Sequence, residues 1–163
     1  MTALLPQFGG LFMTLLAFVA ALSVIVAVHE YGHYIVGRWS GIKAEIFSIG
    51  FGPVLFARTD KHGTVWQIAA LPFGGYVKFL GDASAASSKD ETAMAEAEAD
   101  PVRLRQTMHG APLWARTATV SAGPIFNFIM SILVFGAMMM TQGRVAEPLS
   151  IGELRPLPAQ GVM

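Results

Sequence analysis

Two long apolar segments divide the chain. Residues 8–28 (FGGLFMTLLAFVAALSVIVAV) carry no charge, and neither do residues 118–140 (ATVSAGPIFNFIMSILVFGAMMM). Each is long enough to cross the hydrocarbon core of a bilayer, which needs about 20 apolar residues. The pattern predicts a membrane α-helical protein, with a first transmembrane helix in residues 1–40 and a second in residues 118–141.

A removable signal peptide is the alternative for the first segment. Such a peptide has basic residues before a shorter apolar core, and a small-residue cleavage site after it. Here the first basic residue is Arg38, and the apolar run passes directly into a polar motif. We therefore interpret the segment as a membrane anchor.

Residues 41–81 change to a pattern typical of strands. Gly41 is a plausible stop for the first helix. Four short runs that follow are rich in β-branched and aromatic residues and are separated by turn signals: 45–52, 54–59, 64–70 and 76–80. We expect two successive hairpins in a small antiparallel β-sheet. The sheet is apolar enough to pack on the membrane part or to dip into the bilayer, where its backbone must be paired or shielded.

The rest of the chain is more polar. Within residues 82–117, the acidic stretch 82–100 indicates a linker with some helix, and residues 101–114 (PVRLRQTMHGAPLW) favour an amphipathic helix on the membrane surface. Residues 142–163 hold one strand-like run, LSIGEL, with nothing to pack against. Because a lone strand is not a domain, we expect the protein to continue beyond Met163.

Composition and charge narrow the function. Hydrophobic residues make up 53% of the chain and charged residues 13%, and the net charge is zero, so no global field favours nucleic acid. The absence of cysteine excludes disulfides and thiolate zinc sites. Nine of the 11 basic residues lie between the two apolar segments: Arg38, Lys43, Arg58, Lys61, Lys78, Lys89, Arg103, Arg105 and Arg116. The positive-inside rule therefore predicts that residues of about 41–117 are cytoplasmic and both termini lie on the opposite side.

The chemistry-bearing motif is His-Glu-Tyr-Gly-His at residues 29–33. Residues four apart on a helix project from one face, so His29 and His33 can offer two nitrogens to one Zn²⁺. Glu30, beside the first ligand, can accept a proton from a water molecule and deliver it to a leaving amine. The alternative is that these residues are merely solvated at the membrane boundary. Three ionisable groups at the end of an apolar helix favour function, because each charge at the helix centre costs about 2.5–3.5 kcal/mol.

A catalytic zinc site needs a third protein ligand. Glu45 begins a predicted strand, whereas soluble thermolysin-like enzymes take this ligand from a helix. Trp39 occupies the position where a metzincin has its third histidine. We interpret Asp60, His62 and His109 as solvated surface residues, since nothing ties their spacing to the pair. We therefore expect the third ligand beyond residue 163.

The chain resembles the site-2 proteases, a family of intramembrane zinc metalloproteases, and within them the bacterial regulator of sigma-E protease type. The resemblance rests on an ordered set of segments: VHEYGHYIVGRWSGIK (28–43), FSIGFGPVLF (47–56), LPFGGYVKFLGD (71–82) and GAPLWARTATVSAGPIFNFIMSILVF (110–135). HExxH alone is generic, but the set in this order is highly specific.

The resemblance implies a fold and a reaction. Family members are multi-pass proteins of the bacterial inner membrane that cleave substrate transmembrane helices, typically anti-sigma factors or remnant signal peptides. Residues 41–81 correspond to a membrane-reentrant β-region that presents an edge strand to the substrate. Residues 142–163 resemble the start of a PDZ domain.

The resemblance also assigns further residues. Asn127 matches a second-span Asn thought to position the substrate or stabilise the oxyanion; a polar helix–helix contact is the alternative. Pro124 fits a kink beside the site, or is simply a tolerated membrane proline. The family's third zinc ligand, an Asp in an LDG-type motif, has no counterpart here. We therefore expect an active full-length protease and an inactive isolated chain.

Two other functions remain open at this stage. In a non-catalytic membrane adaptor, the β-region and the PDZ-like part would bind partners and HExxH would be vestigial. A metal transporter would need more intramembrane ligands than two His and one Glu, and the second apolar segment contains none.

Overall fold

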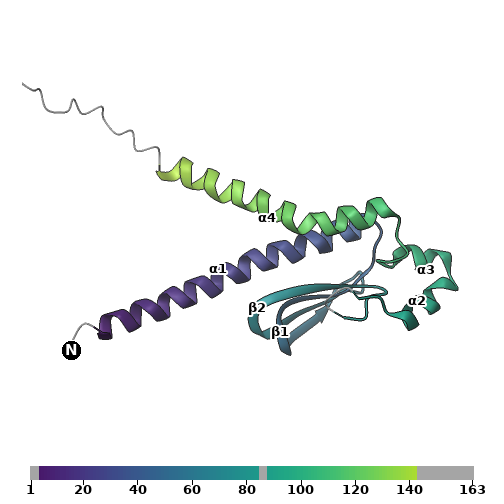
Figure 1. Ribbon diagram of the computed structural model, residues 1–163, viewed down its shortest axis with the longest axis horizontal. Helices are drawn as coiled ribbons and strands as arrows, with labels where there is room; N and C mark the ends of the chain where they lie inside the picture. The colour runs from purple at the N-terminus through teal and green to yellow at the C-terminus, as the bar shows by residue number, and fades with distance from the viewer. Residues whose placement is uncertain (1–3, 85–87, 143–163) are drawn as a thin grey trace, which may run out of the picture.

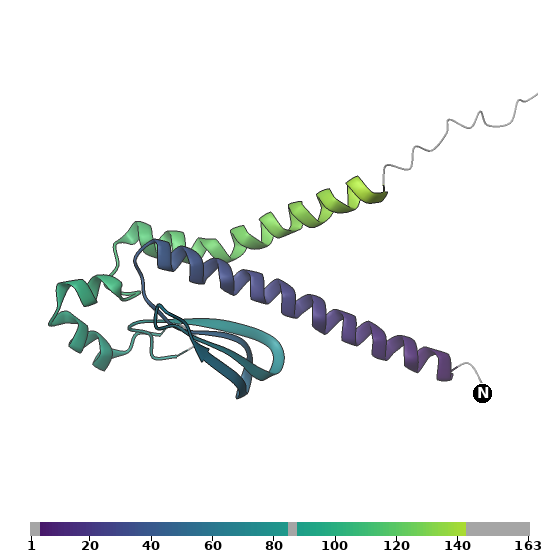
Figure 2. The ribbon, with the colours of Figure 1, turned by 180° about the vertical axis from the view of Figure 1, so that it is seen from behind.

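The computed structural model describes residues 4–84 and 88–142. Along the chain it forms α1 (Leu4–Trp39), β1 (Ala44–Thr59), β2 (Val65–Phe79), α2 (Glu91–Glu98), α3 (Pro101–Gln106) and α4 (Leu113–Gln142). The long helices α1 and α4 lie side by side at one end and diverge toward the other (Figure 1). In both views α1 lies between α4 and the sheet, and α1 contacts both (Figure 2). The predicted PDZ-like segment at 142–163 falls almost wholly outside the described residues.

The two long helices confirm the expected pair of apolar spans. Gly10–Trp39 and Leu113–Thr141 are both long and apolar enough to cross a membrane. The second helix begins earlier than residue 118, the start that we predicted. Its first turn forms at Pro112, whose carbonyl accepts hydrogen bonds from the backbone N–H groups of Ala115 (3.0 Å) and Arg116 (3.2 Å). Hydropathy marks the apolar part of a helix, whereas the helix itself extends into its polar flank.

Helix α1 ends as the glycine signal predicted. Gly41 has φ +82°, a left-handed conformation that only glycine adopts readily. The Gly41 N–H bonds to the carbonyl of Arg38 (3.1 Å), and the Ile42 N–H reaches back to the carbonyl of Gly37 (2.8 Å). This pair of bonds is a Schellman motif, which satisfies carbonyls that the helix end leaves without a partner. The guanidinium of Arg105 also donates to the carbonyl of Ser40 at 2.9 Å.

The sheet corrects the prediction of two successive hairpins. It contains two long, bent strands, and only the turn at residues 60–64 separates them. The first part of β1 pairs with both the end and the beginning of β2 (Phe47 with Val77 and with Trp66), whereas its last part pairs with the beginning alone (Thr59 with Val65). Gly50 and Gly52 adopt φ of +90° and +85°, so they bend β1 without ending it. A glycine next to a proline can therefore curve a strand where local turn rules predict its end.

The segment between the sheet and α4 agrees with the prediction in one part and differs in another. The helix expected within the linker is α2, which Asp90 caps by accepting bonds from the N–H groups of Thr92 and Ala93. The single amphipathic helix predicted at 101–114 is instead the short α3 followed by a turn. At Gly110 the chain passes so close to α3 that an added Cβ would lie 2.3 Å from the Leu104 carbonyl oxygen. This approach is open only to glycine, and it follows the extended Thr107 at which α3 ends.

The core lies where the sheet, the end of α1 and the start of α4 meet. Tyr34 and Phe47 are almost fully buried, and their rings pack against that of Trp66 with centroid distances of 5.0 and 4.3 Å. The other buried members come from the two strands, the start of α4 and the segments that connect these elements: Ile42, Ala44, Val77, Phe79, Met108, Ala111 and Ala115. This core fixes β2 against the last turns of α1.

Candidate active site

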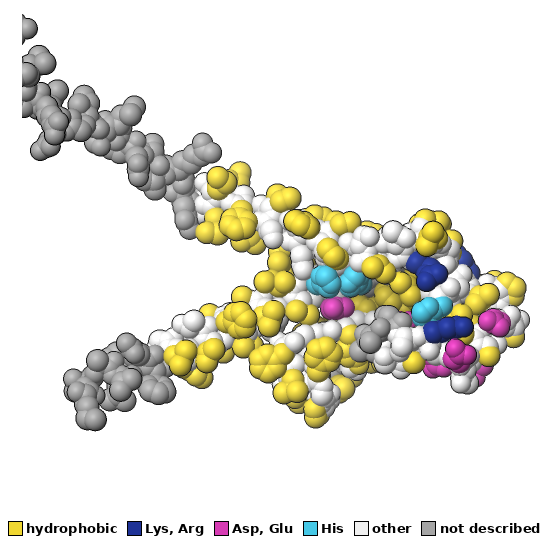
Figure 3. Space-filling model, in the orientation of Figure 1, with side chains coloured by type: hydrophobic (Ala, Val, Ile, Leu, Met, Phe, Trp, Pro, Cys, Tyr) yellow, Lys and Arg dark blue, Asp and Glu magenta, His cyan; other side chains and the backbone are white. Residues whose placement is uncertain are grey.

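The two histidines of the motif lie one turn apart on α1, close to its better-packed end. Their ring centroids are 4.7 Å apart and the ring planes are nearly perpendicular, at 83°. Figure 3 shows histidine and acidic side chains together where the two long helices meet, surrounded by hydrophobic side chains. The helical spacing therefore brings His29 and His33 together as predicted.

Helix α4 faces the pair with three residues spaced by four: Thr119, Gly123 and Asn127. The Thr119 carbonyl oxygen lies 2.7 Å from Nδ1 of His33. Because a carbonyl can only accept, Nδ1 carries the proton and Nε2 of the neutral ring keeps its lone pair. Metal-binding histidines usually hold their second nitrogen in this way. The His33 ring is thus oriented as a ligand.

The partner of His29 is Asn127. Its Nδ2 lies 3.1 Å from His29 Nδ1. Its Oδ1 is buried and has no hydrogen-bond partner within the described residues. The sequence-based assignment of Asn127 to the site thus acquires a position, in contact with the first histidine of the motif.

The free nitrogens of the two rings converge on Gly123. A Cβ added to Gly123 would lie 2.4 Å from Nε2 of His33 and 2.7 Å from Nε2 of His29. The missing side chain therefore lets both rings approach the backbone of α4, with their Nε2 atoms on the same side. Two neutral imidazoles converging on one point are a donor set that suits Zn²⁺. The residues present therefore fit two of the ligands of a zinc site.

Glu30 points toward the sheet. It is half-buried, and the backbone N–H of Val77 donates to its carboxylate. At Gly75, two residues before Val77 in β2, an added Cβ would stand 3.3 Å from Glu30 Cγ and 2.7 Å from the Ser48 carbonyl oxygen. The glycine lets the backbone of β2 approach the motif, so the acid lies between the histidines and the sheet.

No third His, Cys, Asp or Glu joins the pair anywhere in the described ranges 4–84 and 88–142. Glu45 instead forms an ion pair with Lys78 at 3.2 Å. His109 is not a simple surface residue, which corrects our interpretation, because its Nε2 lies 3.4 Å from Oδ1 of the fully buried Asp82.

Asp60 is also more than a solvated residue, another correction. Its carboxylate accepts bonds from the backbone N–H groups of His62 (2.8 Å) and Thr64 (3.0 Å) and from the side chains of Trp66 and Tyr34 (both 3.2 Å). Partial desolvation raises the pKa of Asp60, but these hydrogen bonds outweigh it and hold the pKa below its ordinary value of 3.8. Asp60 therefore organises the turn between the strands.

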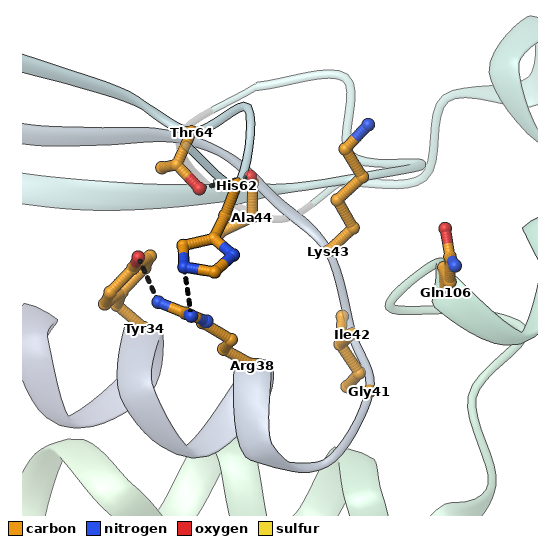
Figure 4. A pocket seen from close by; sticks show the side chains of 9 residues that line it. All are labelled: Tyr34, Arg38, Gly41, Ile42, Lys43, Ala44, His62, Thr64 and Gln106. Atoms are coloured by element: carbon orange, nitrogen blue, oxygen red, sulfur yellow. Dashed lines mark hydrogen bonds between the residues drawn. The ribbon is translucent and has the colours of Figure 1, made fainter. Parts of the chain in front are cut away.

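The same turn is joined to the end of α1. Figure 4 shows the Arg38 guanidinium between the Tyr34 hydroxyl, at 3.4 Å, and the exposed His62, whose Nε2 lies 2.5 Å away. They line a cavity of about 370 Å³ that no residue of the HExxH motif reaches. The contacts there hold the hairpin turn against the helix that carries the motif.

Sequence reasoning missed the contribution of Thr119 and Gly123. A backbone carbonyl leaves no trace in the identity of its residue, so nothing marked Thr119. Gly123 stood next to a proline in an apolar helix, where glycine is common. The available signal was the spacing of residues 119, 123 and 127, which places them on one helical face like the spacing of the two histidines.

Comparison with known proteins agrees with the zinc metalloprotease interpretation of this site. The model of a family described as Peptidase family M50 matches residues 17–160. "Putative zinc metalloprotease Atu1380" of Agrobacterium fabrum is 47% identical over 156 residues, which are 95% of this chain and 41% of that protein. "Metalloprotease MmpA" of Caulobacter vibrioides is 39% identical over 152 residues, 89% of this chain and 38% of that protein. The chain thus spans about two fifths of the length of these relatives.

Proposed function

The chain belongs to peptidase family M50, the site-2 protease family, and we propose that it supplies the first part of the active site of an intramembrane zinc metalloprotease. The observation that supports this most directly is the convergence of the His29 and His33 Nε2 atoms beside Gly123, on an apolar helix long enough to span a bilayer. If His29 and His33 were merely solvated at the membrane boundary, their rings would not need to be oriented with both Nε2 atoms beside the same glycine.

His29 and His33 would hold Zn²⁺, with an aspartate beyond residue 163 as the third protein ligand. When bound, the metal would polarise the scissile carbonyl and lower the pKa of a water molecule. Glu30 accepts the proton that this water loses and passes it to the nitrogen of the leaving amine. The Val77 N–H holds the Glu30 carboxylate on the side of the histidines that faces the sheet.

The β-region would receive the substrate within the membrane. Large apolar side chains on the bent part of the hairpin are exposed: Phe51, Val54, Leu55, Phe56, Ile68, Leu71 and Phe73. The ladder reaches into this part through three pairs, Phe51 with Leu71, Val54 with Ala69 and Phe56 with Ile68. Such pairing of backbone groups is what insertion into a bilayer requires. The Ser23 hydroxyl donates to the Pro72 carbonyl at 2.9 Å, which ties the bend to the middle of α1.

The substrate is a transmembrane helix, of the anti-sigma-factor or remnant-signal-peptide class. A helix must unwind before its peptide bonds can reach a catalytic centre, and an unwound segment can add a strand to a sheet edge. The part of β2 beside Glu30 is close enough to bring such a strand to the acid.

The proposed topology follows from charge. Trp39 and Trp114 are exposed at the same end of the two spans, where aromatic residues mark the membrane interface. The basic residues between the spans then place the sheet turn, α2 and α3 on the cytoplasmic side of a bacterial inner membrane, with both termini on the other side.

Cleavage of a reporter transmembrane helix tests the proposal. We expect full-length protein to cleave the reporter and Glu30→Gln to abolish cleavage while retaining zinc. The isolated 163 residues should be inactive, because two ligands bind zinc weakly. Cleavage by the isolated chain that is lost with Glu30→Gln would show that its ligand set is complete, contrary to the proposal.

Zinc content separates the protease from the adaptor. The protease requires about one zinc per full-length molecule and loss of zinc in His29→Ala. A membrane adaptor with a vestigial motif would contain no zinc in either form.

A further inference from the structure

We propose that Asn127 is a positioning residue that fixes His29 as a zinc ligand, by accepting a hydrogen bond from Nδ1–H of His29 through its side-chain oxygen. The inference rests on the proposed function, since it assigns a role toward the same metal. It differs from the role that the family resemblance suggests, which directs Asn127 at the substrate.

The argument begins with the proton on each ring. A neutral imidazole that binds metal through Nε2 must carry its proton on Nδ1. His33 meets this requirement because the Thr119 carbonyl accepts from its Nδ1 at 2.7 Å. His29 also places its Nε2 beside Gly123 and needs an acceptor at its own Nδ1.

The group in hydrogen-bonding reach of His29 Nδ1 is the amide of Asn127, at 3.1 Å. The two ends of an amide have nearly the same shape, so a half-turn about the last side-chain bond exchanges them. With Nδ2 facing the ring, Nδ1 must be the acceptor and Nε2 carries the proton, which blocks metal binding. With Oδ1 facing the ring, Nδ1 carries the proton and Nε2 is free. Only the second orientation is compatible with a zinc ligand.

The same half-turn changes what lies on the other side of Asn127. Its second polar position is buried without a partner in the described part of the chain. In the metal-binding orientation this position holds the NH₂ group, with donors left for a group outside the described residues. If Asn127 only made a polar contact between α1 and α4, its partner could be any polar atom of α1, whereas here the partner is Nδ1 of His29.

Helix α4 thus supplies the outer contacts of both ligands from one face. The Thr119 carbonyl holds His33, Asn127 contacts His29 two turns further on, and Gly123 between them lets both rings lie against the helix. Outer contacts of this kind typically change metal affinity by 10–100-fold when removed.

Zinc affinity of the full-length protein in detergent, measured by competition with a chelator, tests the inference. Asn127→Leu keeps the branched shape but removes the acceptor, and we expect a 10–100-fold loss of affinity. Asn127→Asp keeps an oxygen acceptor and removes the NH₂ donor, and its added negative charge favours a bound cation, so its affinity should not fall below that of the wild type. Ser131→Ala is the matched control, because its hydroxyl donates only to the Asn127 carbonyl of the same helix.

The ring nitrogen shifts of His29 in zinc-free protein give a readout that is independent of the metal. We expect the Nδ1–H tautomer in the wild type and in Asn127→Asp, and a mixture in Asn127→Leu. Wild-type zinc affinity and an unchanged tautomer in Asn127→Leu would overturn the inference while leaving the protease intact. Absence of zinc from the wild type, with no difference from His29→Ala, would instead refute the proposed function.

Discussion

Replacing Gly123 by alanine tests the metal centre with a single methyl group. The new Cβ would lie 2.4 Å from Nε2 of His33 and 2.7 Å from Nε2 of His29, whereas real Cβ contacts essentially never fall below 3.0 Å. The nearer ring must therefore retreat by at least 0.6 Å. Zinc–nitrogen bonds measure about 2.0–2.1 Å and tolerate deviations of about 0.2 Å. The displacement is roughly three times that tolerance, so both ligands cannot keep their bonds.

The substitution has a different effect on the helix itself. Alanine is about 1 kcal/mol more favourable than glycine in a helix interior. Overpacking of a tight contact costs about 1–3 kcal/mol, so the net change in the free energy of unfolding should be small, at most about 2 kcal/mol. Gly123→Ala is therefore expected to retain its helical content while losing zinc.

The assay compares zinc content after dialysis against a chelator, helicity by circular dichroism and reporter cleavage. Gly136→Ala is the matched control, because it lies on the same helix and an added Cβ there meets nothing within 4 Å. We expect the control to retain zinc and activity, and Gly123→Ala to lose at least 100-fold in zinc affinity. A Gly123→Ala protein with wild-type zinc content and cleavage would refute the convergence of the two nitrogens.

Three further predictions address the surroundings of the site. Gly32→Ala places a Cβ 2.7 Å from the Ala122 carbonyl oxygen, a backbone atom. The overpacking cost of about 1–3 kcal/mol, less about 1 kcal/mol gained in helix propensity, should lower stability to thermal unfolding in detergent by up to about 2 kcal/mol, and a raised midpoint would contradict the close packing. Because these 163 residues contain no cysteine, Leu55→Cys and Lys61→Cys each introduce a single thiol into them. In inverted vesicles, a membrane-impermeant maleimide should modify Lys61→Cys and spare Leu55→Cys. Equal labelling of the two variants would argue against insertion of the bend into the bilayer. Because the pKa of Asp60 is lowered in the folded protein, its stabilising effect is complete above pH 3.8 and is lost as the pH falls through the lower pKa of the folded state. The difference in the free energy of unfolding between wild type and Asp60→Asn should therefore shrink at acidic pH. A difference that stays constant would exclude a stabilising role of the Asp60 carboxylate.

The sequence predicted those parts of the fold that depend on local patterns. Charge-free length marked both spans, and the left-handed preference of Gly41 marked the end of α1. An antiparallel sheet was predicted correctly, but the way its strands are connected and paired was not. Local turn signals at Gly52 indicated a strand end, whereas pairing with distant β2 residues carries the strand through the bend. Such pairing is a tertiary interaction, which a local pattern does not encode.

The candidate site was predictable to the extent that its spacing lies within one helix. His29, Glu30 and His33 are neighbours on α1, so the 3.6-residue period alone brings them together. The residues that orient them lie 86 and 98 positions away on α4. Their contribution depends on how two helices cross and, for Thr119, on a carbonyl that every residue has. The family resemblance marked Asn127, but neither its contact with His29 nor the role of the Thr119 carbonyl could be derived from spacing along the chain.

Because α1 and α4 diverge, the two helices contact each other near one end only. The two helices contact each other at Gly32, where an added Cβ would meet Ala122 and Phe126, and apolar side chains such as Leu11 and Phe135 are exposed on the separated parts of the helices. Leu11 lies about 32 Å along α1 from Gly32, whereas the two histidines lie within about 5 Å of it. A tilt of α1 about this contact that displaced Leu11 by several ångströms would displace the histidines by only about one sixth as much, so the separated parts could adjust to the bilayer with little change at the site.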